Sequence, residues 1–178
     1  QVVKPGDTGA HVVVLQVALI VRGLIGDSAG NRDGNYGNAT QDVIRQFQTL
    51  AGLGADARIC PDLQEWDYGR YEGITTAEIR QSVPDWTVFS HPCPDGESLT
   101  QVQERCEALI TRLVQQHPGG RVALFAHGHI LRSLAGCWLG LGVAGGALLV
   151  LGTGSFCVLG SEREQRALLR WNAPVPHP

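Results

Sequence analysis

Apolar residues recur at helical spacing near the start of the chain. Val12, Leu15 and Leu19 lie on one face of a helix predicted over residues 9 to 22, which Gly23 ends. The remaining apolar positions make this helix apolar nearly all round: Val13, Val14, Val17, Ile20 and Val21. Such a helix needs a partner that buries its second face. A further helix is predicted from Thr40, a good N-cap residue, to Gly52.

The second half of the chain changes to an α/β pattern. A capping-box sequence opens a helix at Ser98, and apolar residues then recur every three or four positions up to His117. The continuous apolar run Val122 to Ala126 predicts a strand buried on both faces, and the next helix is predicted over Ile130 to Leu139. Two closing strands follow, at Phe156 to Leu159 and Leu168 to Trp171. A buried strand followed directly by a helix is typical of a mostly parallel α/β sheet.

Composition narrows the class of protein. The 178 residues are 43% hydrophobic and 17% charged, which is ordinary for a folded domain, and the net charge of −3 contains no long basic run. We therefore expect neither nucleic-acid nor membrane-surface binding. The most apolar stretches are shorter than the roughly 20 residues of a membrane-spanning helix. The five cysteines are odd in number and contain no C-x-x-C pair, so we expect free thiols.

The tripeptide His127-Gly128-His129 carries the candidate chemistry. It follows the buried strand directly, at the carboxyl edge of the sheet where α/β proteins bind ligands. The glycine lets a ligand approach the backbone, and the N-terminus of the following helix favours an anion. A histidine in this place stabilises or protonates a phosphoryl oxygen. The alternative is a strand-end histidine that only hydrogen-bonds a neighbouring carbonyl group.

The two histidines also define a candidate metal site. They are two positions apart on extended chain, so both rings can point the same way, as in many His-x-His metal pairs. Glu65, or the pair His91 and Cys93, would complete a site for zinc. A zinc ion there would activate water at neutral pH and polarise a phosphoryl oxygen.

The N-terminal motifs resemble a known family. The segments Pro5-Gly6-Asp7-Thr8-Gly9, Asp33-Gly34-Asn35-Tyr36-Gly37 and Phe47-Gln48 look like the peptidoglycan-binding domain of the small three-helix type. The resemblance implies a helical, wall-binding-like domain over residues 1–57.

Residues 58–178 resemble a second family. Glu65-Trp66-Asp67-Tyr68-Gly69, Cys93-Pro94-Asp95-Gly96-Glu97-Ser98 and Phe125-Ala126-His127-Gly128-His129 look like the histidine phosphatase superfamily, in its phosphoglycerate mutase-like branch. The resemblance implies that Glu65 is the general acid and that His127 stabilises the transferring phosphoryl group. In that family the phosphate is carried on the histidine of an Arg-His-Gly motif that ends the first central strand. This chain contains no Arg-His-Gly.

The missing motif has a structural consequence. The predicted fold is α/β, with a small helical N-terminal domain joined to an incomplete three-layer sheet domain. The strand Val122 to Ala126 would lack the first strand of the fold as its neighbour, and an unpaired apolar edge invites association. The apolar first helix could cover this edge within one chain or across a dimer, and we expect a homodimer.

Three hypotheses for function follow. The first is a hydrolase that acts on small phosphate esters without a phosphohistidine, using Glu65, His127 and His129, with or without zinc. The second is a non-catalytic peptidoglycan-binding protein that keeps the phosphatase half as a scaffold. The third is a fusion without evolved activity. The wall-binding resemblance indicates export and the unpaired cysteines indicate the cytoplasm, so the sequence leaves the location open.

Overall fold

The computed structural model describes residues 11–15, 58 and 60–174. Four strands form one sheet in the order β2-β1-β3-β4. Their bounds are His11–Leu15 for β1, Arg121–Phe125 for β2, Ser155–Glu162 for β3 and Gln165–Pro174 for β4. The other residues of the helical domain predicted over residues 1–57, including the helix from Thr40, lie outside the described residues.

Strand β1 corrects the sequence prediction. Residues 11–15 were predicted to be helical, but they form a strand that pairs parallel with β2, Val13 opposite Ala123, and antiparallel with β3, Val13 opposite Val158. Five consecutive residues rich in β-branched valine suit a central strand, and long-range pairing outweighs the helical spacing. The expectation that β2 lacks its neighbour is therefore wrong. The structure of a single chain does not test the expected homodimer. An unpaired edge of β2, however, no longer supports it.

The sheet is mixed rather than mostly parallel. Of its three pairings among the described strands, β1 with β2 is parallel, while β1 with β3 and β3 with β4 are antiparallel. The closing pair β3 and β4 was predicted and is a hairpin, because the short Arg163-Glu164 turn returns the chain beside itself.

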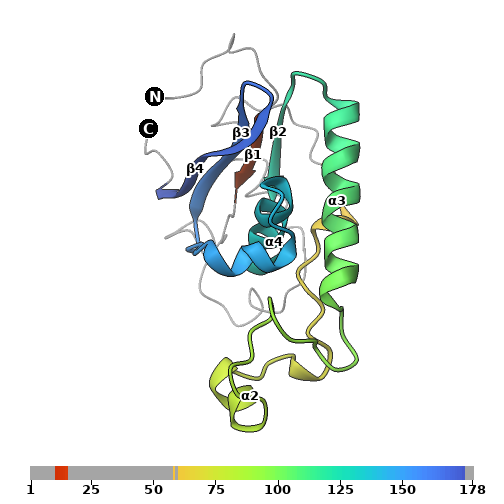
Figure 1. Cartoon of the computed structure of the whole chain (residues 1–178), viewed down its shortest axis with the longest axis vertical. Coiled ribbons are helices and arrows are strands. Elements are labelled where there is room, and N and C mark those ends of the chain that lie inside the picture. Colours follow the sequence, from red (N-terminus) through yellow and green to blue (C-terminus); the bar gives the residue numbers. More distant parts are fainter. Residues whose placement is uncertain (1–10, 16–57, 59, 175–178) are drawn as a thin grey trace.

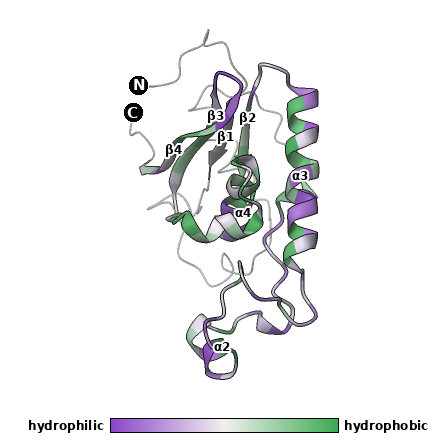
Figure 2. Cartoon of the chain, viewed as in Figure 1, coloured by the Kyte–Doolittle hydropathy of each residue, from purple (hydrophilic) through white to green (hydrophobic). Residues whose placement is uncertain are grey.

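The helices follow the predicted pattern. Helix α3 (Leu99–Gln116) begins at Ser98 with a complete capping box, and α4 (Gly128–Trp138) follows β2. In Figure 2, α3 carries hydrophilic and hydrophobic stripes, whereas α4 is hydrophobic over most of its surface. The difference fits their surroundings, since α4 is buried along most of its length. None of the helices in the described part of the chain is long and apolar enough to cross a membrane.

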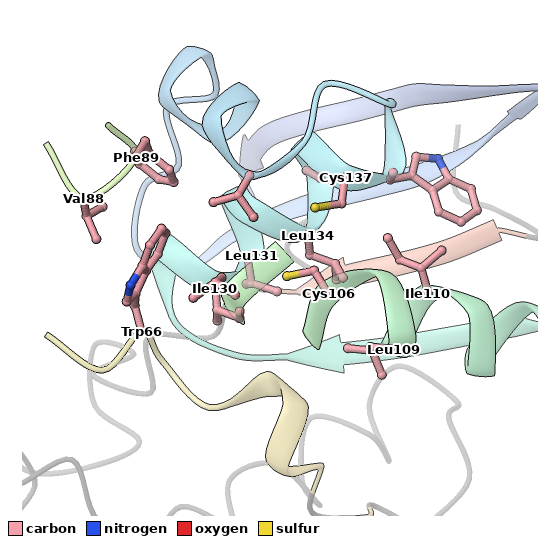
Figure 3. Packing of buried hydrophobic residues seen from close by; sticks show 14 of the residues in the cluster. Trp66, Val88, Phe89, Cys106, Leu109, Ile110, Ile130, Leu131, Leu134 and Cys137 are labelled. Carbon is pink, nitrogen blue, oxygen red and sulfur yellow. The ribbon is translucent and has the colours of Figure 1, made fainter. Parts of the chain in front are cut away.

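The core lies between α3, α4 and the sheet. Figure 3 shows side chains from both helices meeting there, and the thiols of Cys106 and Cys137 lie between them. All five cysteines are free, as expected.

A third part of the chain lies beyond the sheet. The short 3-10 helix η3 (Gly69–Tyr71) and the helix α2 (Thr76–Ser82) lie at the end toward which β1 and β2 point, whereas the 3-10 helix η2 (Pro61–Leu63) packs against α3 (Figure 1). A further 3-10 helix, η4 (Val143–Leu148), packs against α4. The segment that contains η3 and α2 therefore lies toward the carboxyl edge of the parallel strands, where the candidate site was predicted.

Candidate active site

The end of β2 places both histidines of the motif. His127 is the N-cap residue of α4, with extended backbone, and its side chain is exposed. His129 lies in the first turn of the helix and is half-buried. The predicted location, at the carboxyl ends of the parallel pair β1 and β2, is thus confirmed for both residues.

Glu65 binds the N-terminus of α4. Its Oε2 atom accepts a hydrogen bond from the backbone N–H of His129 at 3.1 Å, and its Oε1 atom accepts one from Ile130 at 2.8 Å. A further N–H, that of Trp66, donates to Oε1 at 2.9 Å. The sequence predicted that the N-terminus of this helix favours an anion, and the anion is the protein's own carboxylate.

These bonds distinguish the two carboxylate oxygens. A carboxylate oxygen offers two lone pairs, and Oε1 uses both for backbone N–H groups. Oε2 accepts one backbone N–H. Oε2 therefore keeps one lone pair that no backbone N–H uses, and the Tyr68 side chain hydrogen-bonds the same carboxylate.

His129 and Tyr68 form a buried polar pair. The Tyr68 hydroxyl lies 2.6 Å from Nδ1 of His129, and the two rings meet edge to face. Burial lowers the pKa of His129, with Arg132 adding to the effect and the negative charge of Glu65 opposing it. Burial also raises the pKa of Tyr68, followed by the negative charges of Glu65 and Glu72. Both groups are thus neutral near pH 7, and Nε2 is the ring nitrogen of His129 left for a ligand.

A network behind the site holds the segment that carries Glu65. The guanidinium of Arg105 donates to both carboxylate oxygens of Glu97, at 3.0 and 2.6 Å. It also donates to the carbonyl oxygens of Asp62 at 2.9 Å and Gln64 at 2.7 Å. Glu97 in turn accepts the backbone N–H of Asp67 at 3.0 Å. These bonds fix the chain on both sides of Glu65 relative to α3.

A pocket opens beside His129. Its volume is about 430 Å³, and its walls come from η3, α2, α4 and the loop after α2. Arg132 is one of the residues that line it, with its guanidinium 4.5 Å from the centre of the Phe89 ring. The sequence analysis missed Tyr68, Phe89 and Arg132 as site residues. Only the quoted motifs around Tyr68 and His129 pointed toward this region, whereas Phe89 carried no signal.

The residues that the structure describes contain no ligand cluster for the predicted metal ion. No group of three or more His, Cys, Asp or Glu side chains in the described part of the chain could hold a metal ion. Of the predicted ligands, His129 uses Nδ1 for Tyr68, and His91 has its Nδ1 atom 2.9 Å from the Ser90 hydroxyl. Cys93 is buried, and burial raises the pKa of its thiol. These residues therefore do not fit a zinc ion, and no step is assigned to one.

The fold and the site define a class of protein. An α/β domain with a carboxylate and two imidazoles at the carboxyl edge of parallel strands has the arrangement of a ligand-handling enzyme domain. The chain belongs to the histidine phosphatase superfamily (branch 1), whose family model matches residues 40–174. A peptidoglycan binding domain is matched over residues 8–59. Both resemblances found in the sequence are confirmed.

Individual relatives agree with the family. An acid phosphatase of Mycobacterium tuberculosis is 42% identical over 120 residues, which cover 67% of this chain and 58% of that protein. Sedoheptulose 1,7-bisphosphatase of Saccharomyces cerevisiae is 39% identical over 97 residues, 46% of this chain and 36% of that protein. The solved structure of an open reading frame product of M. tuberculosis covers 93% of this chain and 98% of that chain, with a TM-score of 0.71 and 25% identity. The chain thus spans about half the length or less of these curated relatives.

Proposed function

We propose that the chain hydrolyses phosphate esters with water as the nucleophile and without a phosphohistidine. Family membership and the phosphatases among its relatives support the reaction class. The observation that carries the mechanism is the Glu65 carboxylate bound across the first turn of α4, beside both histidines. At the end of β1, where the family's Arg-His-Gly would stand, the chain continues as Gln16-Val17-Ala18.

Each residue has a role in this proposal. The exposed imidazole of His127 donates a hydrogen bond to a phosphoryl oxygen and stabilises the charge that develops there. Nε2 of His129 holds a second oxygen, because Tyr68 fixes the ring through Nδ1. Oε2 of Glu65 transfers the proton, either from the attacking water or to the leaving alcohol. No metal ion is needed in this scheme.

Activity of two variants tests the roles. Glu65→Gln and His127→Ala should each lower phosphomonoesterase activity about a hundredfold, the usual range for losing a general acid or an electrostatic stabiliser. Thr100→Ala, an exposed position on α3, is the control and should keep full activity. Full activity in both site variants would refute the assignment.

The chemical nature of the intermediate gives a second readout. When the reaction with an ester labelled at its phosphorus is quenched during turnover, the protein should carry no acid-labile phosphoryl group. A phosphoryl group trapped on any histidine would overturn the water mechanism. Assays with and without chelator separate a metal-assisted reaction from the proposed one, since chelation should change nothing.

The peptidoglycan binding match favours a second function. Residues 8–59 match this domain, so the chain could serve as a wall-binding protein whose phosphatase half is a scaffold. Co-sedimentation of the full chain with purified sacculi tests this. Binding without measurable hydrolysis of mono-, di- or triesters would favour the second function over the first.

A further inference from the structure

The pocket beside His129 has an apolar wall and a positively charged residue in its lining. Aromatic rings from two segments, η3 and the loop after α2, form part of the wall: Tyr71, Trp86 and Phe89. Aliphatic side chains complete it: Ile74, Ile79 and Val88. Its volume of about 430 Å³ suits a small molecule with one or two rings.

The aromatic wall is fixed before any ligand arrives. Tyr71 and Trp86 meet edge to face, with ring centres 5.4 Å apart. Phe89 meets both Trp66, at 5.9 Å, and His129, at 5.5 Å, in the same way. Trp86 and Phe89 are almost fully buried. Such packing fixes the positions of the rings, so binding of an apolar group beside them requires little rearrangement.

Arg132 adds a positively charged side chain to the lining of the pocket. The Nε atom of Arg132 donates to the carbonyl oxygen of Gly146 at 3.0 Å, and the guanidinium lies over the ring of Phe89. Arg132 follows His129 by about one turn of α4, and both residues line the pocket. A phosphate group placed beside both would meet an arginine and an imidazole, while the rest of the ligand would lie along the apolar wall.

We propose that the pocket binds the leaving group of the substrate and selects phosphate monoesters whose alcohol carries an aromatic ring. The assignment of the bound group as a leaving group rests on the proposed function, whereas the preference for an aromatic ring can be tested by binding alone. Glu72, Thr76 and Thr87 also line the pocket, but the hydroxyls of a sugar or glycerol group that lie against the aromatic and aliphatic side chains would find no hydrogen-bond partner there, and unpaired hydroxyls are costly to bury. An aromatic ring placed against Tyr71, Trp86 and Phe89 leaves no hydroxyl unpaired.

Binding of two phosphonates, which cannot be hydrolysed, tests the preference without catalysis. Benzylphosphonate and methylphosphonate carry the same charged head and differ in the phenyl ring. Burying about 60 Å² of ring surface corresponds to about tenfold tighter binding. Titration calorimetry of the full chain should therefore show benzylphosphonate binding at least about tenfold tighter. Equal affinities would overturn the proposal.

A pair of matched variants locates the effect. Ile74 lines the pocket and is 44% exposed, whereas Leu141 is 53% exposed and is not part of the pocket wall. Both positions accept an aspartate without loss of core packing. Ile74→Asp should remove most of the difference between the two phosphonates, and Leu141→Asp should leave it unchanged. Loss of the difference in both variants, or in neither, would contradict the assignment of the pocket.

Hydrolysis rates then connect binding with the reaction. Benzyl and ethyl phosphate have leaving alcohols of similar acidity, so a ratio of their kcat/KM values reports the pocket rather than leaving-group chemistry. We expect benzyl phosphate to be favoured about tenfold, and glycerol phosphate to resemble ethyl phosphate. Tight benzylphosphonate binding without hydrolysis of any ester would refute the proposed function and keep the binding site. Hydrolysis without preference would refute the binding site and keep the function.

Discussion

Arg105 should be worth far more to stability than an exposed arginine with the same kind of partner. Its side chain is 15% exposed and that of Glu97 is 23% exposed, and the two form a bidentate pair. Arg70 also pairs with a carboxylate, Asp95 at 3.0 Å, but these side chains are 73% and 76% exposed. The two pairs allow a comparison of the same chemistry at different burial.

The structure sets the size of the expected difference. Arg105→Ala removes four hydrogen bonds made by a charged donor and leaves the carboxylate of Glu97 without its cation. Breaking a largely buried pair of this kind costs about 3 kcal/mol of the free energy of unfolding. Arg70→Ala should cost at most about 1 kcal/mol, because water and salt screen the exposed pair. Arg105→Lys keeps the positive charge but loses the bidentate hydrogen bonds of the guanidinium, so its cost should lie between those of the two alanine variants.

Urea unfolding of the three variants and the parent chain measures these costs. The midpoints should fall in the order parent, Arg70→Ala, Arg105→Lys and Arg105→Ala, with similar slopes. Arg105→Ala should also lower phosphatase activity, since it releases the segment that carries Glu65. The reasoning is refuted if Arg105→Ala is no more destabilising than Arg70→Ala.

Three further predictions use other parts of the site. The pKa of His129 lies below its ordinary value of 6.5, so between these two values the unfolded chain binds more protons than the folded one. The contribution of neutral His129 to the free energy of unfolding should be fully present above about pH 6.5 and be lost as the pH falls below it. Urea midpoints measured at several pH values should therefore fall less in His129→Gln than in the parent chain. An equal fall in both would show that His129 is not the cause. Tyr68→Phe should cost about 1 to 2 kcal/mol, because Nδ1 of His129 loses its partner; an unchanged unfolding midpoint would contradict the pair. Gly69→Ala should cost at least about 2 kcal/mol, since Gly69 has a φ of +52° and an added Cβ would lie 2.2 Å from the carbonyl oxygen of Pro94; Gly73→Ala, at a φ of +73° with open space around it, separates backbone strain from the clash.

The sequence predicted the local parts of the fold. Helix α3, helix α4, strand β2 and the β3–β4 hairpin each carry their signal within a few residues, as capping residues, apolar spacing or a turn. The sequence predicted that Glu65 and the two histidines, which lie in short motifs, belong to the candidate site, and the structure places Glu65 against the first turn of the helix that begins with these histidines. Phe89 and the Glu97–Arg105 pair were not predicted, because their roles arise from contacts across the fold, such as the 41 positions between Arg105 and Gln64.

Strand β1 shows where local pattern and fold disagree, and what this means for chemistry. The feature that made residues 9 to 22 unusual as a helix was apolar character on every side, and the same character is typical of central strands that pair with a neighbour on each side. At residues 11–15 the backbone pairing with β2 and β3 decides the structure. The place of the family's first strand is therefore filled, yet the residues that follow it, Gln16 and Val17, bring no histidine nucleophile. Pairing requires only backbone groups and apolar side chains, whereas phosphohistidine chemistry requires one particular imidazole. A chain can thus keep the sheet without this nucleophile, and for this reason the function that we propose uses water and the residues at the end of β2.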